Sequence, residues 1–401
     1  MSTAAAADPF APAPLGPLTL PNRFIKAATF EGMARKGLVT DRLVDFHRAV
    51  ARGGVGMTTV AYLAVSPDGQ GAPAEIVVRD EAVPGLFRLA EAVHAEGAKV
   101  SAQLGHAGPV AAGTGHTGLA PSRVFSPVAM KFTRAVTDGD IERITGDFAR
   151  AAGLLRQAGF DAVEVHLGHN YLLSAFLSPA LNRRTDRWGG SVANRVEFSR
   201  RVVRAVREAV GPSMAVLAKL NMDDGYPGGL WLDDSVEAAR LLQSDGVLDA
   251  FELTGGSSFK NPMYLFRGEV PLAEMAASYR QPVKTGFKLM GKRFLREYPF
   301  EEAYFLPYAR QFREALSTPI VLLGGINRLD TVQAALEEGF AFVAMGRALL
   351  REPDLLRRWR SGATSEGLCV HCNKCMPTIY RGTHCVLVAP EARPGHAPAA
   401  G

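Results

Sequence analysis

Two histidines and a tyrosine follow one apolar run of the chain, at positions 166, 169 and 171. Two imidazole N–H groups can hold a carbonyl oxygen while negative charge develops on it. A tyrosine hydroxyl, with an ordinary pKa of about 10, is protonated at neutral pH and can donate a proton. A zinc pair of His166 and His169 is an alternative, but H-E-x-x-H spacing is absent and no carboxylate follows. The spacing therefore favours an oxyanion-binding site with Tyr171 as its proton donor.

Glycines and one arginine follow two later apolar runs, as Gly324-Gly325 and Gly346-Arg347. Glycines let backbone N–H groups approach phosphate oxygens, and an arginine adds charge. A lone Gly-Gly pair is also typical of a tight turn. The two loops together predict a phosphate site.

Lys219 lies inside an otherwise apolar run, 215–221. A buried ammonium is costly unless it is paired, so an anionic partner is expected. Either a bound anionic group or an ion pair with Glu164 or Glu252 would serve.

All four cysteines fall close together near the end of the chain, at Cys369, Cys372, Cys375 and Cys385. Such spacing can wrap a tetrahedral zinc or a [4Fe–4S] cluster, and it is not that of a disulfide framework. His371 and His384 are further potential ligands.

Eight apolar runs separated by helical patterns must position these side chains. The runs expected to be strands cover residues 24–28, 56–62, 99–104, 161–166, 215–221, 249–254, 320–324 and 341–346. Helical spacing followed by Gly97, Gly159 or Gly339 precedes three of them, as in βα units. No G-x-G-x-x-G follows a strand, which argues against a doubly wound sheet. We therefore expect an α/β fold, a single-domain (β/α)8 TIM barrel with excursions after strands three, four and six. Its site lies at the carboxyl ends of the strands.

The organisation expected from the chain is a loose segment 1–17, a barrel 18–362, and a cysteine-bearing extension with a flexible tail 363–401. The net charge of +5 is spread over 45 basic and 40 acidic residues without like-charge blocks, so neither nucleic acid nor membrane is an expected partner. No signal peptide or membrane-length apolar run is recognisable, and a cytoplasmic location is the default expectation.

Read together, these positions resemble the Old Yellow Enzyme family of FMN-dependent oxidoreductases. The most specific stretch is residues 159–179, GFDAVEVHLGHNYLLSAFLSP, continued by NRRTD at 182–186 and WGGSVANR at 188–195. Supporting matches are LPNR at 20–23, QLGHAG at 103–108, GGI at 324–326 and MGRALL at 345–350.

The resemblance implies FMN at the barrel mouth and a role for each motif. Lys219 stands where the family usually has an arginine near flavin N1, and His166, His169 and Tyr171 match the substrate-oxygen pair and the proton donor. The phosphate loops match Gly324, Gly325, Gly346 and Arg347. The residues implied against the flavin ring are Ala27, Ala28, Thr29, Phe30, Tyr62 and Gln103. Phe30 and Pro109 depart from the family, which often has Thr or Cys and Arg there.

The cysteine segment resembles the iron–sulfur segment of larger relatives such as 2,4-dienoyl-CoA reductase, which carry further nucleotide-binding domains. A redox cluster would lack a second flavin as electron supplier in this chain. We therefore expect a structural metal, zinc or iron–sulfur, or a metal-free remnant.

The implied reaction is NAD(P)H-driven reduction of FMN, followed by hydride transfer to an activated C=C bond of a small enone or enoate. A flavin-dependent amine or N-methyl demethylase on the same barrel is the alternative. A metal-dependent hydrolase or lyase using His166 and His169 is the candidate from another class. A homo-oligomer is compatible with the chain.

Overall fold

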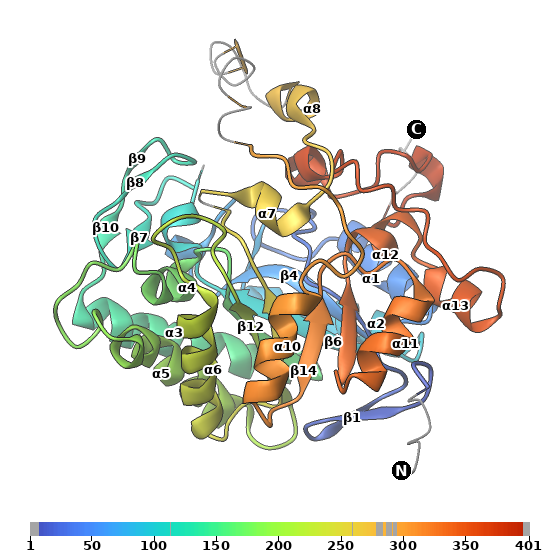
Figure 1. Ribbon diagram of the computed structural model, residues 1–401, viewed down its shortest axis with the longest axis horizontal. Helices are drawn as coiled ribbons and strands as arrows, with labels where there is room; N and C mark the ends of the chain where they lie inside the picture. Colours follow the sequence, from blue (N-terminus) through green and yellow to red (C-terminus); the bar gives the residue numbers. More distant parts are fainter. Residues whose placement is uncertain are drawn as a thin grey trace.

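Eight parallel strands form a closed barrel in the computed structural model, which describes residues 8–112, 114–258, 260–277, 284–285, 291 and 295–395. Each strand pairs with the next around the barrel, and β15 pairs with β3 to close it. The expected (β/α)8 architecture is confirmed (Figure 1). The barrel strands are β3 (Phe24–Lys26), β4 (Met57–Ala64), β6 (Lys99–Gly105), β11 (Ala162–Leu167), β12 (Ala215–Asn221), β13 (Ala250–Thr254), β14 (Ile320–Leu323) and β15 (Phe342–Met345).

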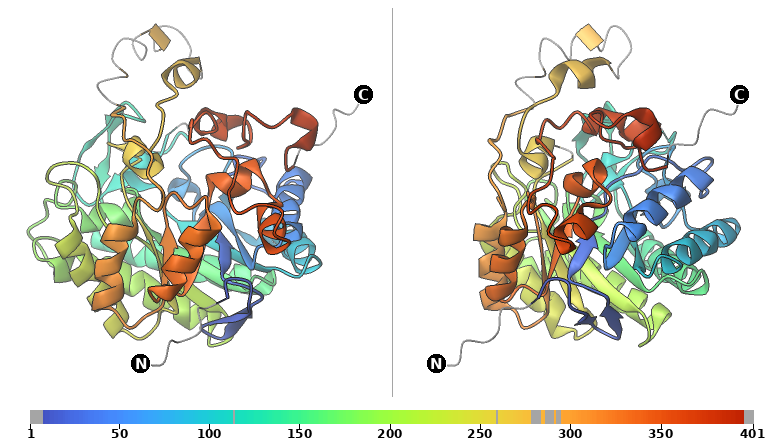
Figure 2. Two further views of the ribbon diagram at one scale, coloured as in Figure 1. Left: turned by 45° about the vertical axis from the view of Figure 1, so that its right-hand side comes forward. Right: turned by 90° about the vertical axis from the view of Figure 1, so that its right-hand side faces the viewer.

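Helices surround the barrel as an outer layer (Figure 2). Gly97, Gly159 and Gly339 have φ of +82°, +78° and +98°, so a glycine in the left-handed region follows each helix end within two residues of its cap, as the sequence predicts. The main helices of this layer are α1 (Asp41–Arg52), α2 (Val83–His94), α3 (Asp138–Gln157), α5 (Val192–Val210), α6 (Leu232–Ser244), α10 (Leu306–Ala315), α11 (Leu329–Glu337), α12 (Arg347–Arg351) and α13 (Leu355–Arg360).

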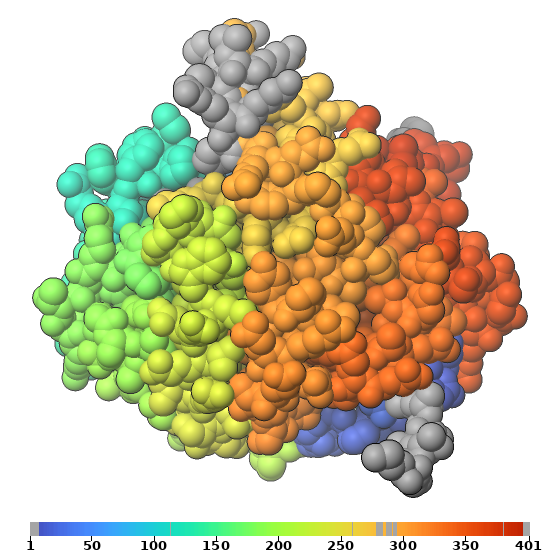
Figure 3. All heavy atoms as spheres, viewed as in Figure 1, coloured from blue at the N-terminus to red at the C-terminus, as the bar shows by residue number. Residues whose placement is uncertain are grey.

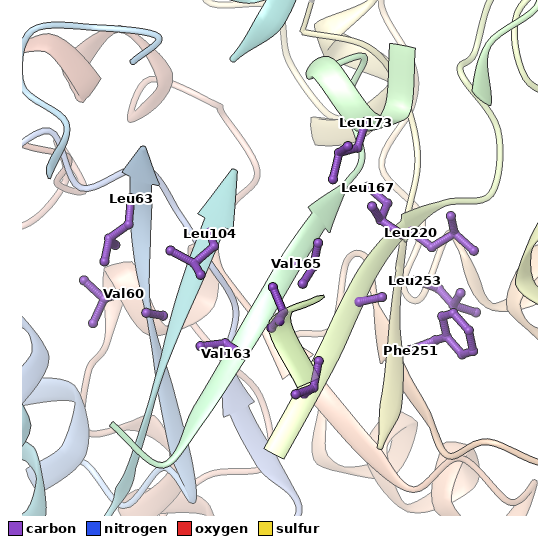
Figure 4. Packing of buried hydrophobic residues seen from close by; sticks show 14 of the residues in the cluster. Val60, Leu63, Leu104, Val163, Val165, Leu167, Leu173, Leu220, Phe251 and Leu253 are labelled. Atoms are coloured by element: carbon purple, nitrogen blue, oxygen red, sulfur yellow. The ribbon is translucent and has the colours of Figure 1, made fainter. Parts of the chain in front are cut away.

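Alternate residues of each strand face opposite sides of the barrel wall. On β11, Val163, Val165 and Leu167 belong to the core between barrel and helices (Figure 4). The intervening residues face the interior and change from Ala162 near the base to Glu164 and then His166. The barrel interior is therefore apolar at its base and polar towards the carboxyl ends of the strands.

A short hairpin closes the base of the barrel. Strand β1 (Ala13–Leu15) pairs antiparallel with β2 (Leu18–Leu20), and Leu15 and Leu20 are fully buried against interior residues such as Ala162. The expected looseness of residues 1–17 is therefore wrong for residues 13–15, because their alternating apolar side chains plug the barrel. Residues 1–7 of that segment lie outside the described residues.

The expected excursions follow the third, fourth and sixth strands of the barrel. They contain β7 (Leu119–Ala120), β8 (Phe125–Ser126), β9 (Lys131–Phe132) and β10 (Arg134–Ala135) after β6, α4 (Leu172–Leu177) after β11, and α7 (Pro262–Phe266) and α8 (Leu272–Ala277) after β13.

The C-terminal extension lies beside the last excursion at the same end of the barrel (Figures 1 and 3). Lys374 forms an ion pair with Glu274 of α8 at 3.1 Å, and residues 376–381 form the 3-10 helix η4 (Met376–Arg381). Residues 363–395 are thus packed on the barrel, whereas the final residues of the expected tail, 396–401, lie outside the described residues. No described helix is both long enough and apolar enough to span a bilayer.

Candidate functional site

The two histidines and the tyrosine meet at the carboxyl end of β11. The ring centroids of His166 and Tyr171 are 4.8 Å apart, and those of His166 and His169 are 5.1 Å apart. Tyr62, from β4, joins them with its centroid 5.1 Å from that of Tyr171 and 6.2 Å from that of His166. The spacing predicts the grouping of His166, His169 and Tyr171, and Tyr62 from a second strand end joins them in one compact cluster.

Burial keeps both imidazoles neutral. It lowers the pKa of His166 well below its ordinary value, with further lowering from His169 and Lys219. Burial and the charge of Lys219 lower the pKa of His169 to about 3. Both rings can thus act as neutral hydrogen-bonding groups throughout the physiological pH range.

The two rings differ in their partners. His169 Nε2 lies 2.9 Å from Thr254 Oγ1, and the tautomer in which Thr254 donates to Nε2 puts the hydrogen on Nδ1. The buried Nδ1 atom of His166 has no hydrogen-bond partner in the described structure. A buried unpaired polar atom is costly, so His166 is suited to bind a ligand atom.

An apolar wall stands beside this cluster. Ala28, Phe30 and Tyr171 pack against a group that includes Ala61 and Tyr62. Burial, followed by the nearby charge of Glu75, raises the pKa of Tyr62 well above its ordinary value, so Tyr62 is a neutral hydroxyl. The segment 27–30, implicated at the flavin ring by the sequence, thus lies next to the histidines and tyrosines.

A charged layer lies one step deeper in the barrel. Lys219 Nζ is 2.5 Å from Glu252 Oε1 and 3.3 Å from Glu164 Oε1, and each of the three side chains is at most 2% exposed. Gln103 Nε2 donates to the same Glu164 oxygen at 2.6 Å. Burial alone would lower the pKa of Lys219, but the two carboxylates raise it, so Lys219 is a cation. Of the two acids that the sequence offers as partners, both contact Lys219.

The pKa of Glu164 in this layer is raised as well, which favours its neutral form. Burial and the neighbouring Glu252 raise its pKa to about 8, although Lys219 acts against them. Glu164 joins Gln103 to Lys219, the two side chains that the sequence places near the flavin. Their shared partner could not be identified from the sequence, which offered Glu164 and Glu252 only as alternatives.

The two glycine loops lie at the ends of adjacent strands, β14 and β15. Gly324 and Gly325 have φ of +117° and +75°. A Cβ atom on Gly325 would lie 2.6 Å from the ring of Tyr304, and one on Gly324 would lie 2.5 Å from that of Phe305. Only glycine fits both the backbone conformation and this close approach.

The segment 27–30 reaches the second of these loops. The backbone N–H of Ala27 donates to Met345 O at 2.9 Å, and a Cβ atom on Gly346 would lie 3.4 Å from Thr29 Cγ2. Arg347 follows as the first residue of α12 and is half-buried. The ring-side segment and the predicted phosphate loops are therefore neighbours around the barrel mouth.

The four cysteines line a single small cavity of about 20 Å³, and Arg347 and Arg351 also line it. Among the described residues, no three His, Cys, Asp or Glu side chains are arranged so that they could hold one metal ion. The described structure thus brings the four cysteines to one cavity without forming a site for a single metal ion.

The chain is similar to several known proteins. Residues 8–248 match the model of the NADH:flavin oxidoreductase / NADH oxidase family. The chain is 57% identical over 389 residues to a 4,4'-dithiodibutanoate disulfide reductase of Rhodococcus erythropolis, with 96% of each chain covered. It is 30% identical to a multifunctional alkene reductase/demethylase of Caballeronia cordobensis, covering 93% of this chain and 52% of that protein.

Among solved structures, a 2-naphthoyl-CoA reductase complex superposes with a TM-score of 0.76 and 26% identity over 88% of this chain and 52% of the other. The chain thus spans nearly the whole Rhodococcus relative but about half of the other two. It belongs to the NADH:flavin oxidoreductase / NADH oxidase family and is an FMN-dependent oxidoreductase that takes electrons from NAD(P)H.

Proposed function

We propose that the protein uses NAD(P)H to reduce an activated C=C bond of a small unsaturated carbonyl compound. The observation that carries the proposal is the cluster of His166, His169 and Tyr171 at one strand end, with two neutral imidazoles beside a tyrosine ring. Neutral imidazoles suit a carbonyl oxygen better than a cationic amine, which would favour aromatic cages or carboxylates.

The residues at the barrel mouth fit FMN. Gly324, Gly325 and Gly346 lie in the loops after two adjacent strands, where backbone N–H groups can bind a phosphate, and Arg347 supplies a positive charge beside them. Gln103 and Lys219 provide an amide and an ammonium for the ring, while Ala28 and Phe30 form part of an apolar wall. Bound FMN would supply the hydride-donating atom of the reaction.

The side chains then have separate tasks. His166 and His169 hold the substrate oxygen and stabilise the negative charge that develops on it as hydride reaches the β-carbon. Tyr171 donates a proton to the α-carbon, which balances the reaction as one hydride and one proton added across the double bond.

Transient kinetics of Tyr171→Phe tests this assignment. Loss of the proton donor is expected to slow flavin reoxidation by cyclohexenone about 100-fold or more, while flavin reduction by NAD(P)H is unchanged. Equal losses in both half-reactions would contradict the role of Tyr171.

Reduction of an organic disulfide is the second candidate, favoured by the high identity with the Rhodococcus enzyme. Here the S–S bond breaks, one sulfur takes the hydride, and the other leaves as a thiolate that takes a proton. Because an ordinary thiol has a pKa of about 8.5, its thiolate leaves with little help from an acid.

The two candidates are distinguished by measuring kcat/KM for cyclohexenone and for 4,4'-dithiodibutanoate with the wild type, Tyr171→Phe and His166→Ala. If the enone is the better substrate class, its kcat/KM exceeds that of the disulfide, and Tyr171→Phe and His166→Ala each remove most of it. A disulfide-specific enzyme would turn over 4,4'-dithiodibutanoate far better and would be only weakly affected by Tyr171→Phe.

A further inference from the structure

The cysteine-bearing extension is hydrogen-bonded to the arginine of the proposed phosphate site. The Nη1 atom of Arg347 donates to the side-chain oxygen of Asn373, which lies between Cys372 and Cys375 in the sequence. The same Nη1 atom donates to Arg267 O at 3.0 Å. The guanidinium is thus held from the extension on one side and from the excursion after β13 on the other.

Both the oxygen and the nitrogen of the Asn373 side-chain amide form hydrogen bonds. Its side chain is 1% exposed, and its Nδ2 atom donates to Arg267 O at 3.1 Å and to Glu269 O at 3.0 Å. Its φ of +54° is in the left-handed region, which asparagine tolerates better than most residues. Both ends of this amide therefore join the extension to elements of the flavin site.

Further contacts hold the extension against other segments at the mouth of the barrel. The ring of His371 stacks on that of Phe300 with centroids 3.3 Å apart and planes at 9°. Thr383, farther along the extension, donates its hydroxyl to Phe30 O and its backbone N–H to Glu31 O at 2.7 Å. The extension contacts both the proposed ring segment and the proposed phosphate side.

We propose that Asn373 is a positioning residue for Arg347, so that the four-cysteine extension forms part of the FMN phosphate site. A guanidinium on a flexible stem binds a phosphate best when its orientation is fixed in advance. Asn373 fixes it by accepting from Nη1 while its own amide is anchored to two backbone carbonyl oxygens. The inference rests on the proposed role of Arg347 in binding the phosphate.

Flavin binding by the full-length chain tests the inference, with FMN and riboflavin as the two probes. Riboflavin lacks the phosphate, so the ratio of the two Kd values isolates what the phosphate site contributes. Asn373→Gly is the informative variant because glycine keeps the positive φ without strain and removes only the amide. Its Kd for FMN is expected to rise roughly tenfold to a hundredfold, the range for a lost hydrogen bond to a charged group. Its Kd for riboflavin should stay within about twofold.

Lys374→Ala is the matched control. Lys374 is the next residue along the extension, but its side chain is 42% exposed and pairs with Glu274, away from Arg347. Both flavins should bind Lys374→Ala as they bind the wild type. Riboflavin binding also reports that Asn373→Gly has folded.

Arg347→Ala separates this inference from the proposed site. If Arg347→Ala keeps the full preference for FMN over riboflavin, Arg347 is not a phosphate ligand and the proposed site itself fails. If Arg347→Ala loses the preference but Asn373→Gly retains it, only the positioning role of Asn373 is wrong. Equal weakening of FMN and riboflavin in Asn373→Gly would also overturn that role, because it would indicate general loosening of the barrel mouth.

Discussion

Replacing Lys219 with methionine is expected to destabilise the protein by an amount that grows with pH. Lys219 faces Glu252 at 2.5 Å and Glu164 at 3.3 Å, and the Oε2 atoms of both acids are buried without a hydrogen-bond partner in the described structure. Methionine fills a similar volume but leaves two carboxyl groups without their cation.

The magnitude follows from the distances. At an effective dielectric constant of about 20, attraction between unit charges 2.5 Å apart is about 7 kcal/mol, and at 3.3 Å about 5 kcal/mol. Desolvation of the lysine opposes these terms, and breaking a buried ion pair by removing one partner typically costs about 3–5 kcal/mol. We expect a loss of that size where both acids are ionised.

The sign of the pH dependence comes from Glu164. Burial and Glu252 raise its folded-state pKa to about 8, above the ordinary value of 4.5. Its contribution to stability is therefore fully present below about pH 4.5 and is lost as pH rises through about 8. Without Lys219, which acts to lower the pKa of Glu164, the Glu164 carboxyl takes up a proton still more readily. The cost of Lys219→Met is therefore smaller near pH 5, where Glu164 is neutral, and largest near pH 9, where Glu164 is ionised.

Denaturant midpoints of the flavin-free full-length chain at pH 5, 7 and 9 measure this difference without a contribution from cofactor binding. Lys99→Met is the matched control, because Lys99 pairs with Asp161 at 2.9 Å but is 36% exposed. That exposed pair should be worth about 1 kcal/mol or less at every pH. A loss for Lys219→Met that is equally small at pH 9, or that grows toward pH 5, would refute the reasoning.

Two other predictions concern the phosphate loop and the cysteines. Gly325→Ala is expected to weaken FMN binding at least tenfold in a fluorescence titration, because its Cβ would lie 2.6 Å from the Tyr304 ring; Gly362→Ala, with a similar φ of +72° but open space around it, should leave binding unchanged. Cys372→Ser is expected to lower metal content and Tm of anaerobically purified protein while turnover at saturating FMN persists. A cluster of four irons with matching sulfide that NADPH reduces would contradict this non-redox role.

Much of this protein follows from local patterns in the sequence. The eight strands and the three glycine-terminated helices are visible because apolar periodicity and helix-ending glycines act over a few residues. The cluster of His166, His169 and Tyr171 is also local, since one strand end carries all three. Parallel strands place their carboxyl ends together, which is why residues on separate strands could be assigned to one mouth.

Only the tertiary structure decided which side chains became partners across the barrel. Lys219 could have paired with Glu164, with Glu252 or with a ligand, and strand register together with barrel curvature brought it to both acids. The leucines of the hairpin at residues 13–20 pack against apolar interior residues at the base of the barrel. Composition alone does not reveal that contact. Asn373 meets Arg347 across 26 positions of chain because the extension folds back over the mouth. Contacts between distant segments depend on the path of the whole chain, and no local pattern encodes that path.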